Sequence, residues 1–93
     1  MNPQWTQDEA IAFECAREVI TDMMAIQTGQ MAEEGRKAAP DIDSLASLRA
    51  ERSRLFQERE ALHIDNPAGI ARIRAEYGAF VRAWRGERRA TSA

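Results

Sequence analysis

Apolar residues recur at helical spacing over residues 7–34 and form two adjacent stripes. The first stripe carries Phe13, Ala16, Ile20, Met23, Met24 and Met31. The second stripe carries Ala12, Cys15, Val19 and Ile26. Together they cover roughly half of the helix circumference, more than the ~100° stripe of an ordinary surface helix. We therefore expect this helix to contact two neighbours, the second of which can belong to another chain.

Two shorter helical patterns follow, over residues 42–63 and 67–85. The earlier one is a series of leucines interrupted by arginines, at Leu45, Leu48, Arg52, Leu55, Arg59 and Leu62. The later one is isoleucine-rich and aromatic, at Ile70, Ile73, Tyr77, Phe80 and Trp84. Because the connection between them is short, we expect the two helices to be antiparallel neighbours. In the resulting hairpin Leu55 lies near Tyr77, Arg52 near Phe80 and Arg59 near Ile73.

Residues typical of helix ends support these three elements. The expected N-caps are Thr6, Asp41 or Asp43, and Asn66. Glu9 completes a capping box with Thr6, and Pro67 suits a first helical position, where its missing N–H costs nothing. Gly35 and Gly86 are expected to end the first and third helices. A linker over residues 35–41 and a frayed tail over residues 87–93 remain.

The pattern predicts an all-α fold in one domain, residues 1–93, with a long N-terminal amphipathic helix plus an antiparallel helical hairpin. A domain of 93 residues leaves a large share of its surface in water, so a second subunit would add stability. The first helix also has more apolar surface than one hairpin covers. We therefore expect a dimeric helical bundle.

Charge is unevenly distributed along the chain, although the formal net charge is only −2. Arg17 is the one basic side chain within residues 1–35, whereas basic residues outnumber acidic ones from residue 36 onward. This asymmetry favours an acidic first helix packed on a basic hairpin. Lys37 is the single lysine, and such a preference for arginine is typical of a GC-rich bacterial genome.

The wide apolar face of the first helix is the leading candidate for function. It favours a non-enzymatic protein–protein interaction or regulatory protein that acts as a homodimer, so the first partner we expect is a second copy of the chain. Another protein bound through the same helix is the alternative partner. The candidate interaction residues are Phe13, Val19, Ile20, Met23, Met24, Ile26 and Met31.

A strip of arginines on the third helix supports a different function, that of a nucleic-acid-binding accessory protein. The strip consists of Arg74, Arg82, Arg85 and Arg89. At 100° per residue these positions fall within about 80° of one another, with Ala71 and Gly78 between them. Arginines separated by small residues suit the approach of a helix to a phosphate backbone. The sequence has no helix-turn-helix, zinc-finger or basic-zipper pattern, so nucleic acid ranks second and a solvated or docked face is the simpler interpretation.

Arg52 and Arg59 interrupt the leucine series of the second helix. Their stems can lie along the seam with the charged ends in water. Alternatively they specify the register or the oligomeric state, as polar core positions do in coiled coils. Anion binding is the third possibility.

The sequence has no signature of catalysis or metal binding. Cys15 and His63 are the only residues of their types and lie far apart, so neither a nucleophile–base pair nor a metal site is expected. A Gly-rich phosphate loop and inward Glu-x-x-His pairs are missing as well. We expect no enzymatic activity and no cofactor. No apolar run approaches the ~20 residues that span a bilayer, and no secretory signal is evident, so a cytoplasmic protein without a membrane partner is expected.

Overall fold

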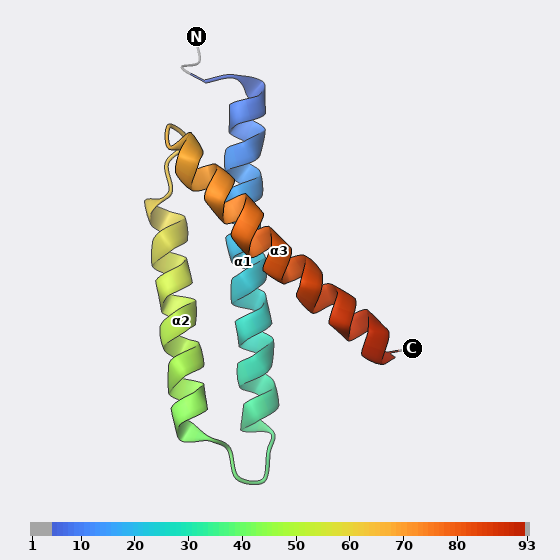
Figure 1. Ribbon diagram of the computed structural model, residues 1–93. Coiled ribbons are helices and arrows are strands. Elements are labelled where there is room, and N and C mark those ends of the chain that lie inside the picture. The colour runs from blue at the N-terminus through green and yellow to red at the C-terminus, as the bar shows by residue number, and fades with distance from the viewer. Residues whose placement is uncertain (1–4, 93) are drawn as a thin grey trace.

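The computed structural model of the protein describes residues 5–92, with the side chains of residues 5–89. Three helices make up this part of the chain: α1 spans Gln7–Gly35, α2 spans Ile42–Ala61 and α3 spans Pro67–Ser92. The all-α prediction is confirmed, since no described residue lies in a strand. α1 and α2 run side by side, and α3 crosses α1 obliquely (Figure 1).

Each helix begins where the sequence predicts. Thr6 Oγ1 accepts a hydrogen bond from the Glu9 N–H at 3.1 Å, and Glu9 Oε1 accepts one from the Thr6 N–H at 2.8 Å, which completes the capping box. At the start of α2, Asp41 Oδ1 accepts from the N–H groups of residues 43 and 44. Asn66 Oδ1 accepts from the Gly69 N–H at 3.1 Å at the start of α3. Such caps each contribute about 1 kcal/mol.

The antiparallel hairpin is formed by α1 and α2, and not by the second and third helices as the sequence predicts. The Cα atoms of α2 and α3 are more than 8 Å apart wherever both helices are described. The chain leaves α2 through Leu62 in an extended conformation (φ −71°, ψ 131°), so α3 departs at an angle instead of turning back along α2. The linker before α2 closes tightly on α1, with Glu34 Oε2 accepting from the Asp41 N–H at 2.9 Å.

All three helices meet in one core, which places α1 between its two neighbours. The largest fully buried side chains, Ile20, Leu55 and Ile73, come one from each helix. The core cluster consists of Ala16, Ile20, Leu55, Leu62, Ile70 and Ile73. Burial of a leucine or isoleucine side chain contributes about 1.5–3 kcal/mol. α1 therefore has the two neighbours that its apolar face predicts, and both are in its own chain.

α3 continues through Gly86, so the predicted end of the helix near residue 85 and the frayed tail over residues 87–93 are wrong for the described residues; Ala93 lies outside them. Contacts of Arg88 stabilise the extra turns. Its guanidinium lies 5.0 Å from the centre of the Trp84 ring and donates to Glu33 Oε1 at 2.9 Å. These contacts with α1 and within α3 offset the cost of about 1 kcal/mol that a glycine imposes on a helix.

The C-terminal ends of the other helices differ slightly from the prediction. α1 includes Gly35, and Arg36 follows it in a right-handed conformation (φ −83°, ψ −11°), so no left-handed glycine ends this helix. α2 ends at Ala61, two residues before the predicted His63, because Leu62 is already extended.

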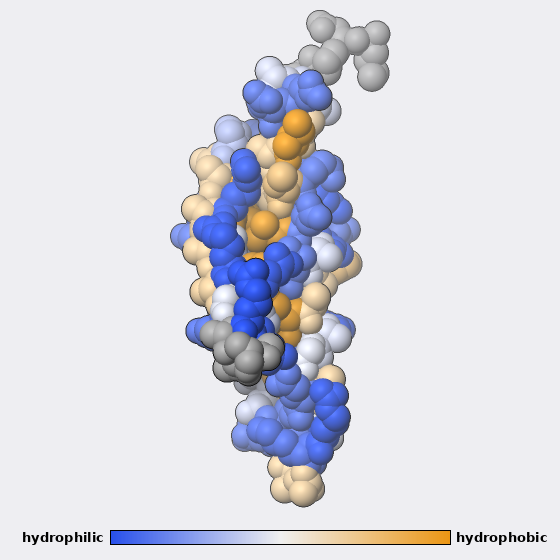
Figure 2. Space-filling view, turned by 90° about the vertical axis from the view of Figure 1, so that its right-hand side faces the viewer, coloured by the Kyte–Doolittle hydropathy of each residue, from blue (hydrophilic) through white to orange (hydrophobic). Residues whose placement is uncertain are grey.

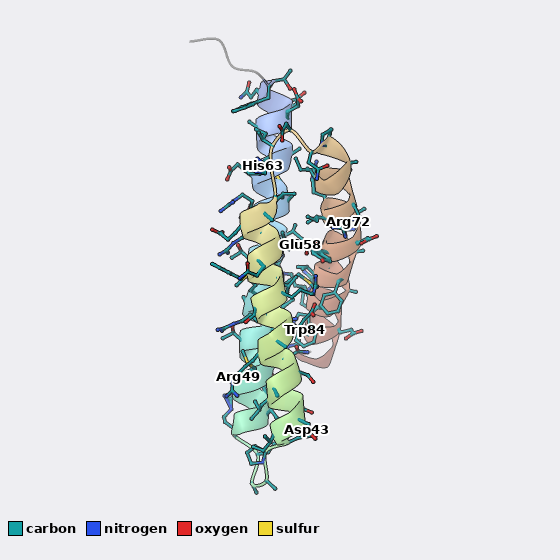
Figure 3. The ribbon with its side chains drawn as sticks, turned by 90° about the vertical axis from the view of Figure 1, so that its left-hand side faces the viewer. Asp43, Arg49, Glu58, His63, Arg72 and Trp84 are labelled. Atoms are coloured by element: carbon teal, nitrogen blue, oxygen red, sulfur yellow. The ribbon has the colours of Figure 1, made fainter. Side chains whose placement is uncertain are left out.

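Polar side chains bridge the gap between α2 and α3 near their connection. Arg72 Nη2 lies 3.0 Å from Glu58 Oε2, and the Tyr77 hydroxyl also donates to Glu58 (Figure 3). Arg54 reaches Tyr77 from α2, with 3.5 Å between Nη2 and the hydroxyl oxygen. Burial alone would raise the pKa of Glu58, but the hydrogen bonds from Tyr77 and Arg72 and the nearby positive charges outweigh it and lower that pKa.

Candidate functional site

The first apolar stripe of α1 is used for packing inside the chain. Ile20 is fully buried, and Phe13, Met23 and Met24 are half-buried against the core. Met31 is half-buried as well. Along this stripe the surface that suggested a partner is thus covered largely by the chain's own helices.

The second stripe of α1 stays partly open to solvent. Cys15, Val19 and Ile26 are half-buried, and Ile11, one turn before Cys15, is 52% exposed. On this side of the molecule apolar residues form a narrow strip between hydrophilic ones (Figure 2). Sequence reasoning missed Ile11 because it lies at the edge of the stripe; its spacing of four residues from Cys15 was the available signal.

A cleft of about 510 Å³ opens between α1 and the C-terminal half of α3, next to the second stripe. Its lining residues are Asp22, Ala25, Ile26 and Gly29 from α1 and Trp84, Arg85, Arg88 and Arg89 from α3. Ile26 belongs to the predicted interaction residues, whereas Arg85 and Arg89 belong to the predicted arginine strip. The crossing of α1 and α3 therefore brings two separately predicted sets of residues into one cleft.

The α3 wall of the cleft is basic and the α1 wall is acidic, as the charge asymmetry of the sequence predicts. Arg85 Nη2 lies 3.4 Å from Asp22 Oδ2, and Arg88 pairs with Glu33. The hydrogen bond from Arg88 holds the pKa of Glu33 below its ordinary value. Arg89 forms no ion pair with a described residue. Arg89 is therefore the arginine of the cleft that is available to a carboxylate or phosphate from outside.

The other two arginines of the strip lie outside the cleft. Arg74 borders a smaller hollow of about 120 Å³, which is also lined by Ala12 and Ile70. Arg82 folds back along α3, and its Nη1 lies 3.1 Å from the point where a Cβ on Gly78 would stand. Both side chains are exposed, and neither forms an ion pair with another residue that the structure describes.

Arg52 and Arg59 lie on a seam between α2 and α1, and not beside Phe80 and Ile73 as the predicted hairpin would place them. Arg59 Nη1 donates to Thr21 Oγ1 at 2.9 Å, and Arg52 Nη1 donates to Thr28 Oγ1 at 3.1 Å. The two arginines therefore connect α2 to one edge of α1. A role of these residues in setting the register of that hairpin stays a prediction.

Within residues 5–92, no helix is both long and apolar enough to cross a membrane. No group of three or more histidine, cysteine, aspartate or glutamate side chains in that part is placed to hold a metal ion. Cys15 is half-buried on α1 and His63 is exposed in the connection after α2.

Comparisons with protein-family models, curated proteins and solved structures find no match for the chain. Ile26 and Trp84 give the cleft apolar surface, and arginines form its rim. Such a cleft suits a segment in which an apolar side chain lies beside carboxylates.

Proposed function

We propose that the protein is a small non-enzymatic protein–protein interaction or regulatory protein that acts as a homodimer. Its binding surface is the α1–α3 face, made of Ile11, Cys15, Val19 and Ile26 together with the cleft between α1 and α3. The observation that carries the proposal is the second stripe of α1, which α2 and α3 leave half open.

The α1–α3 face has the composition of an interface. Its centre is apolar, and its edges carry charged residues such as Asp22 and Arg85, which resembles the apolar core and polar rim of known interfaces. Removal of apolar surface from water contributes about 25 cal/mol per Å². A small domain gains proportionally more from such burial, because it leaves more of its surface in water than a large one.

The test is the molar mass in solution across a range of concentrations, measured by light scattering or sedimentation. We expect the mass of two chains at micromolar concentration and of one chain on dilution. Ile11→Glu should remove the dimer. Ile42→Glu is the matched control, because Ile42 is 73% exposed and lies at the start of α2, away from the α1–α3 face. A wild-type protein that stays monomeric throughout would contradict the proposal, as would an Ile42→Glu variant that loses the dimer while Ile11→Glu keeps it.

A second candidate function, nucleic-acid binding as an accessory protein, is favoured by the arginine strip. Arg74, Arg82 and Arg89 form no ion pair within the described residues, so three guanidiniums on α3 are free to bind phosphate. Arginine also binds phosphate in a bidentate manner, which favours it over lysine for this role. The chain as a whole is mildly acidic, which weakens its non-specific attraction to nucleic acid and keeps this candidate second.

A gel-shift titration with short DNA and RNA at increasing salt tests this second candidate. We expect a shift at low salt that weakens as salt rises, because phosphate contacts release counterions. Replacement of Arg82 and Arg89 by glutamine should abolish it. Replacement of Arg36 and Arg49 by glutamine makes the same change in charge elsewhere and should leave it intact. Absence of any shift at low salt would rule the candidate out.

In this proposal the protein works in the cytoplasm of a bacterial cell, without a cofactor and without a membrane partner. A different protein bound to the α1–α3 face would replace the homodimer as the functional complex. In that case the wild-type protein would be monomeric on its own and would bind the other protein, and Ile11→Glu would abolish this binding.

A further inference from the structure

We infer that the cleft between α1 and α3 receives the N-terminal half of α1 from a second copy of the chain, with the two α1 helices antiparallel. This inference rests on the proposed homodimer and specifies how the two copies meet. A two-fold axis then makes the contact isologous, so each copy both fills the other's cleft and has its own cleft filled.

The N-terminal half of α1 has the chemistry that the cleft accepts. Its outward face carries the exposed Ile11, together with the carboxylates of Asp8, Glu14 and Glu18, all of which are exposed. The cleft offers apolar surface from Ile26 and Trp84, and Arg89 on its α3 wall has no ion pair with a described residue. An acidic helix with an exposed isoleucine is therefore complementary to the cleft in both apolar character and charge.

The spacing of the outward residues of α1, together with the open space at Gly29, favours one register. These residues recur at intervals of four and three positions: Ile11, Cys15, Glu18, Asp22, Ala25 and Gly29. The cleft is lined by residues 22–29 of α1, so the complementary segment from the second copy is residues 11–18 in reverse order. Ile11 then lies opposite the second copy's Gly29, and Cys15 lies opposite its Ala25.

This register places large residues against small ones. A Cβ built on Gly29 meets no atom within 4 Å, so the space above Gly29 is open to receive the Ile11 side chain of the second copy. Glu18 falls opposite Asp22, whose charge is already matched by Arg85 at 3.4 Å. Glu14 falls opposite Ile26, which lines the cleft together with Arg89, and Arg89 has no ion pair within the described part of its own chain.

The geometry predicts which positions can be cross-linked. The two-fold axis crosses α1 at the level of Ile20, so Ile11 and the second copy's Gly29 lie at the same height along the paired helices, on the sides that face each other. At a rise of 1.5 Å per residue, Ile11 lies about 27 Å along the helix from its own counterpart. Disulfides require Cα atoms within roughly 7 Å.

The experiment uses three variants in a Cys15→Ser background, oxidised under mild conditions and separated on a non-reducing gel. The double variant Ile11→Cys/Gly29→Cys should shift to a disulfide-linked dimer that reductant reverses, because these two residues are opposite each other across the interface. Ile11→Cys alone and Gly29→Cys alone are the matched controls and should not shift. Ile11 and Gly29 are both exposed, so these changes leave the core intact, and circular dichroism checks the helix content.

Each outcome decides between arrangements. Cross-linking of Ile11→Cys alone, to the same extent as the double variant, would mean parallel helices and overturn the inference. A dimer in light scattering without cross-linking of the double variant would also overturn it, while the proposed homodimer would stand. A monomer in light scattering for the wild type and every variant would overturn the homodimer, and the inference with it.

Discussion

The hydroxyl of Tyr77 donates a hydrogen bond to Oε1 of Glu58 over 2.6 Å, across a gap in which the backbones of α2 and α3 do not touch. α3 packs mainly on α1. Glu58 of α2 nevertheless contacts α3 twice, through this hydrogen bond and through its ion pair with Arg72. The orientation of α3 relative to the hairpin therefore depends partly on one carboxylate.

Replacement of Tyr77 by phenylalanine should lower the free energy of unfolding by about 1–2 kcal/mol, since hydrogen bonds to charged groups contribute about 1.5–3 kcal/mol and this one is only partly buried. Urea denaturation gives the value. A double-mutant cycle with Glu58→Gln isolates the pair, and a coupling energy near zero would show that the bond does not hold α3.

Acid should destabilise the protein. Hydrogen bonds from Arg88 to Glu33 and from Arg54 to Glu51 lower the pKa values of these two carboxyl groups, and Glu58 is lowered too. Groups with a lowered folded pKa contribute stability in full above their unfolded pKa, near 4.3 for glutamate, and lose it as pH falls through the folded pKa. We expect the free energy of unfolding, measured in urea, to fall below about pH 4.5. Stability that rises from pH 5 to pH 3 would contradict this, and Glu58→Gln should reduce the slope.

Gln27 should be replaceable with a gain in stability. Its side chain is 8% exposed, and its Oε1 has no hydrogen-bond partner among the described residues. An unpaired buried polar atom costs about 1–3 kcal/mol, so Gln27→Met should raise the free energy of unfolding by about 1 kcal/mol. Gln57→Met is the control, because Gln57 is exposed and its change should stay within about 0.5 kcal/mol. A loss of stability in Gln27→Met would show that the amide is satisfied in solution.

Two glycines of α3 should respond to alanine in opposite directions. Gly86→Ala should stabilise the protein by about 0.5–1 kcal/mol, because Gly86 is helical and a Cβ there meets nothing within 4 Å. Gly69→Ala should destabilise it, because its Cβ would lie 2.5 Å from Asn66 Nδ2 and displace the side chain that caps α3. Thermal unfolding followed by circular dichroism compares the two. Equal effects from both would argue against a continuous α3.

The starts of the helices could be predicted from the sequence, whereas the pairing of the helices could not. Caps such as Thr6 with Glu9, or Asn66 with Gly69, depend on residues only three positions apart. The leucine series of α2 fits α1 as well as it fits α3, because a helix face does not specify its partner. The extended backbone at Leu62 decides between them, and a single dihedral angle has no signature in the apolar pattern.

The candidate site was predicted in parts. Ile26, Arg85 and Arg89 were each identified from their helical faces, but their meeting in one cleft depends on where α3 crosses α1. The signal for that crossing was the opposite charge of the first and third helices. The Arg85–Asp22 ion pair is one contact between these opposite charges. Trp84 was predicted to face the second helix, so its place in the cleft could not be anticipated.

The packing of α3 on α1 also bears on how this protein folds. α1 and α2 are joined by a short linker and can pair from that end, whereas the Arg88–Glu33 pair closes a loop between residues 55 positions apart in the chain. We expect such a distant contact to form after the hairpin, because loop closure costs more entropy for a longer loop. During synthesis the hairpin therefore emerges with the α3-facing flank of α1 uncovered, and the growing chain carries an exposed apolar surface until α3 follows.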